Sequence, residues 1–218
     1  WSSPGFGSVT VGSYGQRDFK AAIGGGLGGN DALRARLAVA DLHRDGFGEN
    51  IVTGDDVSDK KVKAARLNVG AYVTDNLDLQ FALDWMDDTS GVRGAKMLKP
   101  NRFAPGTLPL DDRYDVRNGM PNVNDTVMHG MSATVNYRAD DDWSFKYVVA
   151  QRDSDTETNI DFDTLQNIIA DVKAFYSDKQ VSNELQVNYD GGGRARGVFG
   201  IYWFDGEAGG QVLNNFFN

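Results

Sequence analysis

The chain has 218 residues, a net charge of −9 at neutral pH and a pI near 4.6. An acidic chain lacks the basic footprint that phosphate binding requires, so no nucleic-acid partner is expected. The absence of cysteine excludes disulfide bonds, thiolate metal sites and cysteine nucleophiles. No stretch of the sequence approaches the roughly eighteen apolar residues of a transmembrane helix.

Apolar and polar residues alternate over nine segments, most of them about ten residues long. Strict alternation is typical of a β-strand, because successive side chains point to opposite faces of a sheet. In residues 77–88, for example, Leu79 and Phe81 share one face, and Asp78 and Gln80 share the other. The expected strands are residues 5–14, 17–27, 32–41, 62–74, 77–88, 126–139, 143–153, 180–189 and 195–205.

Short turns and long loops alternate between these segments. Turns of a few residues follow the second, fourth, sixth and eighth segments, so they lie at one end of the sheet. The polar loops at residues 42–61, 89–125 and 154–179 lie at the other end. In the third loop Leu165, Ile168, Ile169 and Val172 have helical spacing, which predicts a short amphipathic helix packed on its neighbours. The chain ends in a Gly/Asn-rich segment, residues 206–218.

This order of strands, turns and loops is typical of an outer-membrane β-barrel, with short turns in the periplasm and long loops outside the cell. A soluble β-sandwich also alternates, but its strands are usually shorter and its loops do not sort by length in this way. The sequence therefore predicts an all-β fold, an antiparallel up-and-down transmembrane β-barrel fragment of about nine meandering strands. His129 fits poorly on the lipid face unless it lies near an interface or the register shifts locally.

The predicted barrel assigns roles to three groups of residues. Charged side chains opposite the apolar face are expected to line the lumen, because hydrocarbon excludes them. These lumen-facing or plug-facing residues are Arg34, Arg36, Arg66, Asp78, Asp84, Lys146 and Glu184. Aromatic rings at strand ends predict membrane-interface belts, formed by Trp85, Tyr137, Trp143, Tyr189 and Trp203. Aromatic side chains in the long loops are candidates for substrate contact or for packing within the loops, namely Phe47, Phe103, Tyr114, Phe175 and Tyr176.

No catalytic arrangement is evident in the sequence, and no cofactor is expected. The two histidines, His43 and His129, fall in different predicted environments. Asp55, Asp56 and Asp59 carry the carboxylates that Ca²⁺ prefers, but their spacing matches no EF-hand. Two lysines adjoin the group, so the sequence favours a solvated surface loop over a metal site.

Along the chain occur, in order, SVTVGSYGQRDFKAAIGGGLG at residues 8–28, ALRARLAVADLHRDGFGEN at 32–50, DTETNIDFD at 155–163, and YSDKQVSNELQV at 176–187 followed by GVFGIYWFD at 197–205. Together these strings resemble the barrel of TonB-dependent receptors of the bacterial outer membrane. The resemblance implies a siderophore-type importer with a plugged barrel of about 22 strands, energised through TonB. Its expected partners are outer-membrane lipid, the TonB system acting through the plug, and a ferric siderophore; cobalamin, haem and oligosaccharides are other substrates of the family.

On this resemblance, residues 1–218 are the N-terminal half of the barrel domain, without the plug, the TonB box and the C-terminal strands. An odd number of strands does not form a closed bacterial barrel. Within the intact protein we expect the lumen cations to pair with plug carboxylates or with the lumen carboxylates. A passive porin-like channel is the alternative function, followed by a soluble adhesion or carbohydrate-binding β-domain.

Overall fold

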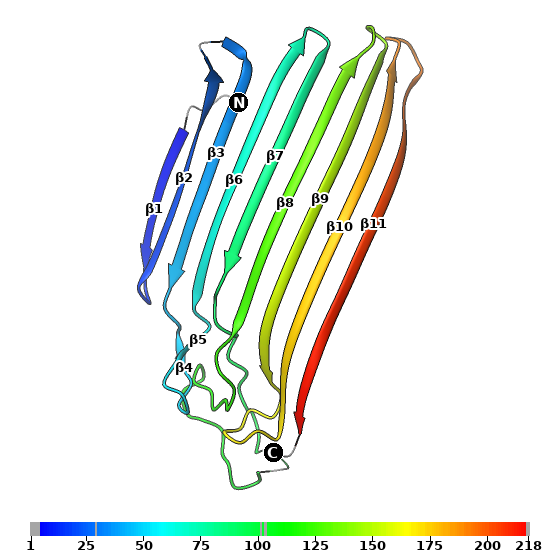
Figure 1. Ribbon diagram of the computed structural model, residues 1–218. Helices are drawn as coiled ribbons and strands as arrows, with labels where there is room; N and C mark the ends of the chain where they lie inside the picture. The colour runs from blue at the N-terminus through cyan, green and yellow to red at the C-terminus, as the bar shows by residue number, and fades with distance from the viewer. Residues whose placement is uncertain (1–4, 29, 101, 103, 217–218) are drawn as a thin grey trace.

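The computed structural model describes residues 5–28, 30–100, 102 and 104–216. Within these residues the chain forms one antiparallel sheet of nine long strands, each hydrogen-bonded to the next along the chain (Figure 1). These strands are β1 (Gly5–Gly12), β2 (Gln16–Leu27), β3 (Asn30–Arg44), β6 (Lys60–Thr74), β7 (Leu77–Asp88), β8 (Asn124–Arg138), β9 (Trp143–Asp161), β10 (Ala170–Asp190) and β11 (Arg196–Phe216). The predicted up-and-down topology is confirmed, and β1 and β11 are the two edges of an open sheet.

Local chemistry explains why the short turns form where they do. In the β8–β9 turn the Asp140 carboxylate accepts hydrogen bonds from the backbone N–H groups of Asp142, at 2.9 Å, and Trp143, at 2.7 Å. Aspartate favours turns for this reason. Between β6 and β7, Thr74 Oγ1 donates to Asn76 Oδ1 at 2.6 Å. As expected, the four predicted short turns lie at one end of the sheet, at the top of Figure 1.

The last three strands are longer than the sequence predicts. β9, β10 and β11 have 19, 21 and 21 residues, so much of the expected loop at 154–179 is strand. The Gly/Asn-rich end also continues as strand to Phe216. Neither stretch has a clean alternation of its own, but each pairs with a neighbouring strand along its length. Ladder hydrogen bonding extended the strands beyond the apolar pattern.

The predicted helix around Leu165–Val172 is wrong. Val172 lies in β10, opposite Ile160 of β9 and Asn214 of β11. The Asp163 carboxylate accepts hydrogen bonds from the N–H groups of Ile169 and Ala170, at 3.1 and 2.6 Å, which joins the start of the connecting loop to its end. No helix long and apolar enough to cross a membrane occurs in the described part of the chain.

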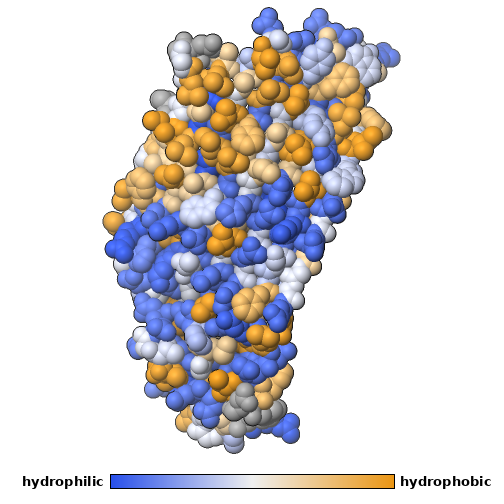
Figure 2. Space-filling model, viewed as in Figure 1, coloured by the Kyte–Doolittle hydropathy of each residue, from blue (hydrophilic) through white to orange (hydrophobic). Residues whose placement is uncertain are grey.

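The sheet has one apolar and one charged face, because side chains directly opposite one another share a face. One row of the apolar face runs from Val69 through Phe81 and Ala133 to Val149. Figure 2 shows apolar side chains gathered over the half of the sheet next to the short turns, with polar side chains beyond them. His129 lies between Trp85 and Asp153 in the ladder, where apolar residues give way to polar ones, and is exposed.

At the other end, the long connections pack together into what we call the loop unit, residues 45–59, 89–123 and 159–174. It includes a short hairpin, β4 (Gly48–Glu49) and β5 (Asp56–Val57). Val116 joins the first two connections, since its C=O accepts from Ile51 N–H and its N–H donates to Glu49 O, each at 3.0 Å. Gly119 N–H donates to Leu165 O at 3.0 Å and joins the second to the third. Of the buried apolar side chains described, only Ala22 lies outside the loop unit; the others are Val57, Val116, Met120, Leu165, Val172 and Ala174.

Candidate functional site

The predicted lumen residues share one face of the sheet. Unbroken cross-strand pairings connect their rows from β3 to β11, with Arg66 opposite Asp84 and Asn136 opposite both Asp78 and Lys146. The residues brought onto this face are Arg34, Arg36, Arg66, Asp78, Asp84, Lys146 and Glu184.

An ion pair spans three strands of this charged face. Arg152 Nη2 on β9 lies 3.1 and 2.9 Å from the two carboxylate oxygens of Asp84 on β7. Gly130 of β8 lies between them, and a Cβ there would come within 2.7 Å of Asp84 Oδ2 and 2.8 Å of Arg152 Nη2. Glycine therefore makes room for the pair. Arg66, although directly opposite Asp84, donates from Nε to Asn68 Oδ1 at 3.3 Å.

Other groups on the charged face also have partners within the sheet. Asp78 accepts from Asn136 Nδ2 at 2.8 Å, and Glu184 accepts from Gln186 Nε2 at 2.6 Å. The Arg34 guanidinium lies 5.6 Å from the centre of the Tyr72 ring, within the range of a cation–π contact. These side chains of the charged face are thus ordered by contacts within the sheet.

Two of the predicted loop aromatics meet at the long-loop end. Phe47 packs edge-on against Tyr114 with ring centroids 5.1 Å apart, and against Tyr14 at 6.2 Å. The guanidinium of Arg44 lies 5.0 Å from the Phe47 ring centre, and that of Arg113 lies 4.5 Å from the Tyr114 ring centre. We call Tyr14, Phe47 and Tyr114, with these two arginines, the aromatic cluster. Three aromatic rings and two positive charges therefore lie together at this end of the sheet.

The remaining loop aromatics are placed differently. Phe175 and Tyr176 lie within strand β10, not in a loop, because β10 begins at Ala170. Both border a hollow of about 460 Å³ that Asp155 and Glu157 also line. Phe103 lies outside the described residues.

The predicted interface aromatics lie at both ends of the apolar band. At the short-turn end Trp143 and Tyr189 have ring centroids 4.7 Å apart, and Tyr137 stacks on Phe145 at 6.4 Å. Trp85 lies near the loop end of β7, opposite His129. Trp203 lies opposite Asn183 and nearer the short-turn end of β11, because this strand continues to Phe216.

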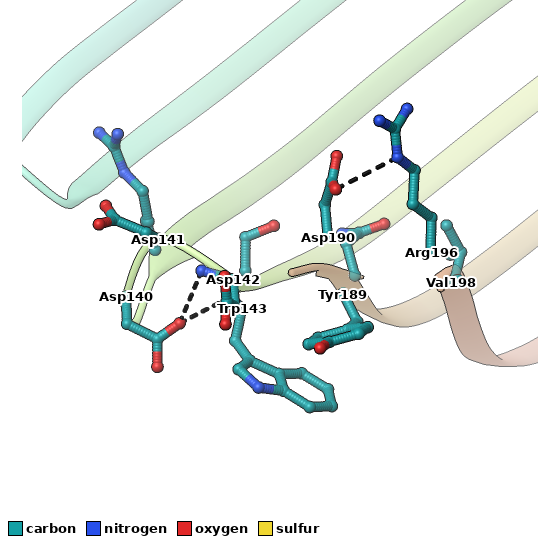
Figure 3. Close-up of a pocket in the computed structure, with 12 residues that line it drawn as sticks. Asp140, Asp141, Asp142, Trp143, Tyr189, Asp190, Arg196 and Val198 are labelled. Carbon is teal, nitrogen blue, oxygen red and sulfur yellow. Dashed lines mark hydrogen bonds and ion pairs between the residues drawn. The ribbon is translucent and has the colours of Figure 1, made fainter. Parts of the chain in front are cut away.

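Trp143 and Tyr189 also line an open hollow of about 470 Å³ at the short-turn end of the sheet (Figure 3). Across the β10–β11 turn, Arg196 Nε lies 3.3 Å from Asp190 Oδ1. Both partners are largely exposed, so this pair contributes little to stability.

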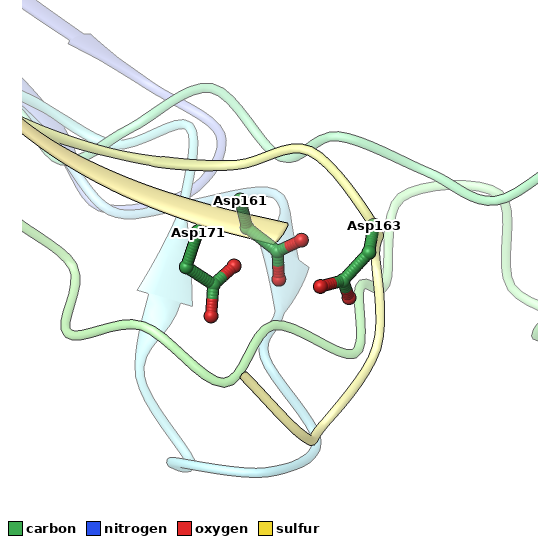
Figure 4. A group of neighbouring side chains, drawn as sticks. All are labelled: Asp161, Asp163 and Asp171. Carbon is green, nitrogen blue, oxygen red and sulfur yellow. The ribbon is translucent and has the colours of Figure 1, made fainter. Parts of the chain in front are cut away.

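The structure also assembles a group that the sequence did not reveal, the acidic triad Asp161, Asp163 and Asp171 (Figure 4). Each side chain offers an oxygen, and these oxygens lie within 4.8 Å of one another. Burial raises the pKa of Asp161 to about 6, and burial with the neighbouring carboxylates raises the pKa of Asp171 to about 7. The Asp-Phe-Asp string was a visible signal, but only the β9–β10 pairing brings Asp171 to it.

The structure does not bring the two histidines together, and it places Asp59 differently from the prediction. His43 lies on β3 and His129 on β8, with β6 and β7 between them, and His43 Nε2 is 3.0 Å from Asp45 Oδ1. Asp59, predicted in a solvated loop, is buried instead, where it pairs with Lys61 Nζ at 2.9 Å and accepts from Gly91 N–H at 2.8 Å. Asp59 therefore fastens the first long connection to the second.

Comparison with known proteins places the fold. No protein-family model and no curated protein sequence matches the chain. Among solved structures it is similar to the ferric yersiniabactin uptake receptor FyuA from Yersinia pestis, with a TM-score of 0.79 and 16% identity over 98% of this chain and 32% of that one. It is also similar to the ferripyoverdine receptor of the outer membrane of Pseudomonas aeruginosa bound to ferripyoverdine, with a TM-score of 0.73 and 14% identity over 95% of this chain and 28% of that one.

A third similar structure is the alcaligin outer-membrane receptor FauA from Bordetella pertussis, with a TM-score of 0.59 and 13% identity over 97% of this chain and 29% of that one. The chain therefore spans about a third of the length of the receptors that it matches. Likeness at this level of identity shows the fold. The predicted fold, an antiparallel up-and-down sheet like part of the β-barrel of these receptors, is confirmed.

Proposed function

We propose that this chain, which has the fold of part of a TonB-dependent receptor barrel, belongs to an outer-membrane importer of a ferric siderophore. The single observation that supports this most is the nine-strand meander with one apolar and one charged face, matched over 95–98% of the chain by receptors of this class. In this proposal residues 1–218 form the N-terminal part of the barrel domain. Lipid covers the apolar face, and the protein is not an enzyme.

The importer and the passive channel differ in their need for energy. The test is to express the complete gene containing this segment in an iron-starved strain that lacks its own siderophore receptors, and to supply a panel of ferric siderophores. We expect growth on at least one siderophore, and loss of that growth when TonB is deleted. Growth that persists without TonB would favour a porin-like channel, and no growth on any iron chelate would count against the substrate class.

The charged face is proposed to border the lumen and contact the plug. Charged groups cannot face hydrocarbon cheaply, whereas the opposite face supplies the apolar band. Arg34 and Arg36 project from adjacent rows of β3, so together they present two positive charges to whatever fills the lumen. Plug carboxylates are the matching partners.

Reversal of both charges, Arg34→Glu with Arg36→Glu, in the complete receptor tests this contact. We expect weaker plug docking and reduced uptake of iron, because two attractive contacts become repulsive. Arg194→Glu, in the exposed turn between β10 and β11, is the matched control and should leave both unchanged. Unchanged docking and uptake in the double variant would contradict the contact.

The aromatic cluster is proposed to contact the siderophore. Ring faces bind flat aromatic chelating groups, and Arg44 and Arg113 supply positive charge for an anionic ferric complex. Tyr114→Ala should lower siderophore affinity by about tenfold, the loss of about 1.4 kcal/mol. Leu98→Ala, at an 82% exposed position of the same connection, is the control. Equal affinities for the two variants would remove the cluster from the binding surface.

A further inference from the structure

The acidic triad lies where the β9–β10 hairpin reaches the loop unit. Asp161 is the last residue of β9 and lies directly opposite Asp171, the second residue of β10. Asp163 belongs to the loop that joins these strands. Figure 4 shows the carboxylates of Asp161 and Asp171 side by side, with that of Asp163 turned toward them. Two facing strands and their own connection therefore converge on one point.

The oxygens of the triad fall into two sets. Asp163 Oδ1 accepts from Leu165 N–H at 2.8 Å, while its Oδ2 accepts from Ile169 and Ala170, as described above. Asp161 Oδ1 accepts from Thr164 N–H at 2.5 Å. In contrast, Asp161 Oδ2 and both carboxylate oxygens of Asp171 have no hydrogen-bond partner among the described residues. Three buried acceptor atoms of the triad thus have no hydrogen-bond donor among the described residues.

Burial makes this arrangement costly. The exposed fractions of Asp161, Asp163 and Asp171 are 6%, 5% and 0%. A buried carboxylate needs a paired charge or a full set of donors, and here three like charges are adjacent. Lys173, the basic residue closest to Asp171 along the chain, binds Glu157 instead, with Nζ 2.7 Å from Oε1. Lys173 therefore does not neutralise Asp171.

We propose that Asp161, Asp163 and Asp171 bind one divalent cation, Ca²⁺ by the chemistry of the ligands. Ca²⁺ takes six to eight oxygen ligands at about 2.3–2.6 Å, so two oxygens on one ion lie at most about 5 Å apart. The triad oxygens lie within 4.8 Å of one another and meet this limit. With no imidazole or thiolate in the group, the site suits a hard cation rather than zinc or copper.

Each carboxylate has a defined part in the proposed site. Asp171 and Asp161 Oδ2 direct unpartnered oxygens at the cation. Asp163 keeps its N–H donors: Oδ2 already accepts from two N–H groups, whereas Oδ1 accepts from Leu165 and has a second lone pair for the metal. The cation then fastens the end of the hairpin at the point where Leu165 O accepts from Gly119 N–H and Asn159 Nδ2 donates to Pro121 O at 2.9 Å. It would hold the third long connection against the second, whatever the receptor imports.

The experiment uses the complete receptor, purified in detergent and treated with chelator. CaCl₂ is titrated calorimetrically into the wild type and into Asp171→Asn, which keeps the side-chain shape but removes one charge. Asp178→Asn, an exposed aspartate on the same strand, is the matched control. We expect Asp171→Asn to lose one Ca²⁺ site or to weaken it about tenfold or more, because affinity follows the number of ligand charges. The control variant should bind Ca²⁺ as the wild type does.

A second measurement keeps the test decisive if Asp171→Asn does not fold. Hydrogen exchange of the wild type, with and without Ca²⁺, should show Ca²⁺-dependent protection in residues 116–123 and 162–170. The proposal is overturned if the wild type binds no Ca²⁺, or if Asp171→Asn binds it as tightly. It is also overturned if the triad holds a shared proton, in which case Asp171→Asn stabilises the receptor at neutral pH equally with and without Ca²⁺.

Discussion

In the sheet, Leu79 and Phe81 leave 40% and 42% of their surface exposed, whereas in the loop unit Val57, Val116 and Leu165 leave only 1%, 2% and 4%. The two regions therefore differ in how far they bury these apolar side chains. The sheet is ordered by backbone ladders and offers its apolar face outward, to lipid in the proposed receptor. The loop unit surrounds these three apolar residues with protein, as the core of a small soluble domain does.

Their polar groups differ in the same sense. The Asp84–Arg152 pair on the sheet is partly exposed, with side-chain fractions of 27% and 45%. In the loop unit, the Asp59 side chain that pairs with Lys61 is 3% exposed. Water screens the first pair more than the second. Equivalent substitutions in the two regions should therefore have unequal effects.

The largest effect is expected in the core of the loop unit. Leu165→Ala removes a buried side chain and should destabilise the loop unit by about 2–5 kcal/mol, while the barrel strands remain paired. Protease digestion of the folded receptor would measure this as faster cleavage in residues 116–123 and 162–169. Leu98→Ala, at an exposed position, should not change the cleavage rate. Equal rates in both variants would mean that the loop unit has no core of its own.

A somewhat smaller effect is expected from a charge on the apolar face of the sheet. Phe81→Arg should destabilise the receptor by about 2–4 kcal/mol in a lipid bilayer, because an arginine near the bilayer centre loses its hydration. Gln80→Arg, one residue earlier and on the opposite face, should have little effect. Urea unfolding in vesicles measures both. A larger loss for Gln80→Arg would show that lipid covers the charged face instead.

A third effect should come from pH, because Asp161 and Asp171 have pKa values raised to about 6 and about 7 from 3.8. Between pH 3.8 and about 7 the folded loop unit therefore binds more protons than the unfolded one. Without divalent cations its stability should therefore be greatest in acid and should fall as the pH rises through about 6–7. Hydrogen exchange of residues 162–170 in chelator, corrected for intrinsic rates, measures this. The Asp171→Asn variant should show a weaker dependence, and a rise in protection with pH would contradict the sign.

The smallest effect is expected for the ion pair across β8. A double-mutant cycle with Asp84→Ala and Arg152→Ala should give a coupling of about 0.2–1 kcal/mol, because the pair is partly exposed and screened. Gly130→Ala should abolish most of this coupling, since its Cβ would lie between the two charges. Urea unfolding at low and high salt measures the cycle. A coupling that is independent of salt would show that water does not reach this face.

Particular elements show how far the sequence could predict the fold. The expected segment 77–88 coincides with β7, because alternation and a turn fix both of its ends. The same reasoning failed at residues 154–179, where the apolar residues at helical spacing fall partly in the loop and partly in β10. Local periodicity had no information about β11, whose ladder with β10 begins at Ala170. The same limit applies to the proposed site residues. Alternation predicted which face of the sheet each charged side chain lies on, but not which side chain it contacts.

The sequence by itself determined which residues share a face of the sheet and at which end the long loops lie. Both follow from the two-residue period of a strand and from the alternation of turn lengths. Only the tertiary structure decided that the three long connections share a core, that Arg152 rather than Arg66 reaches Asp84, and that Asp171 joins Asp161 and Asp163. These contacts join residues that are 8 to 68 positions apart, and strand pairing and loop packing, rather than local pattern, bring them within reach.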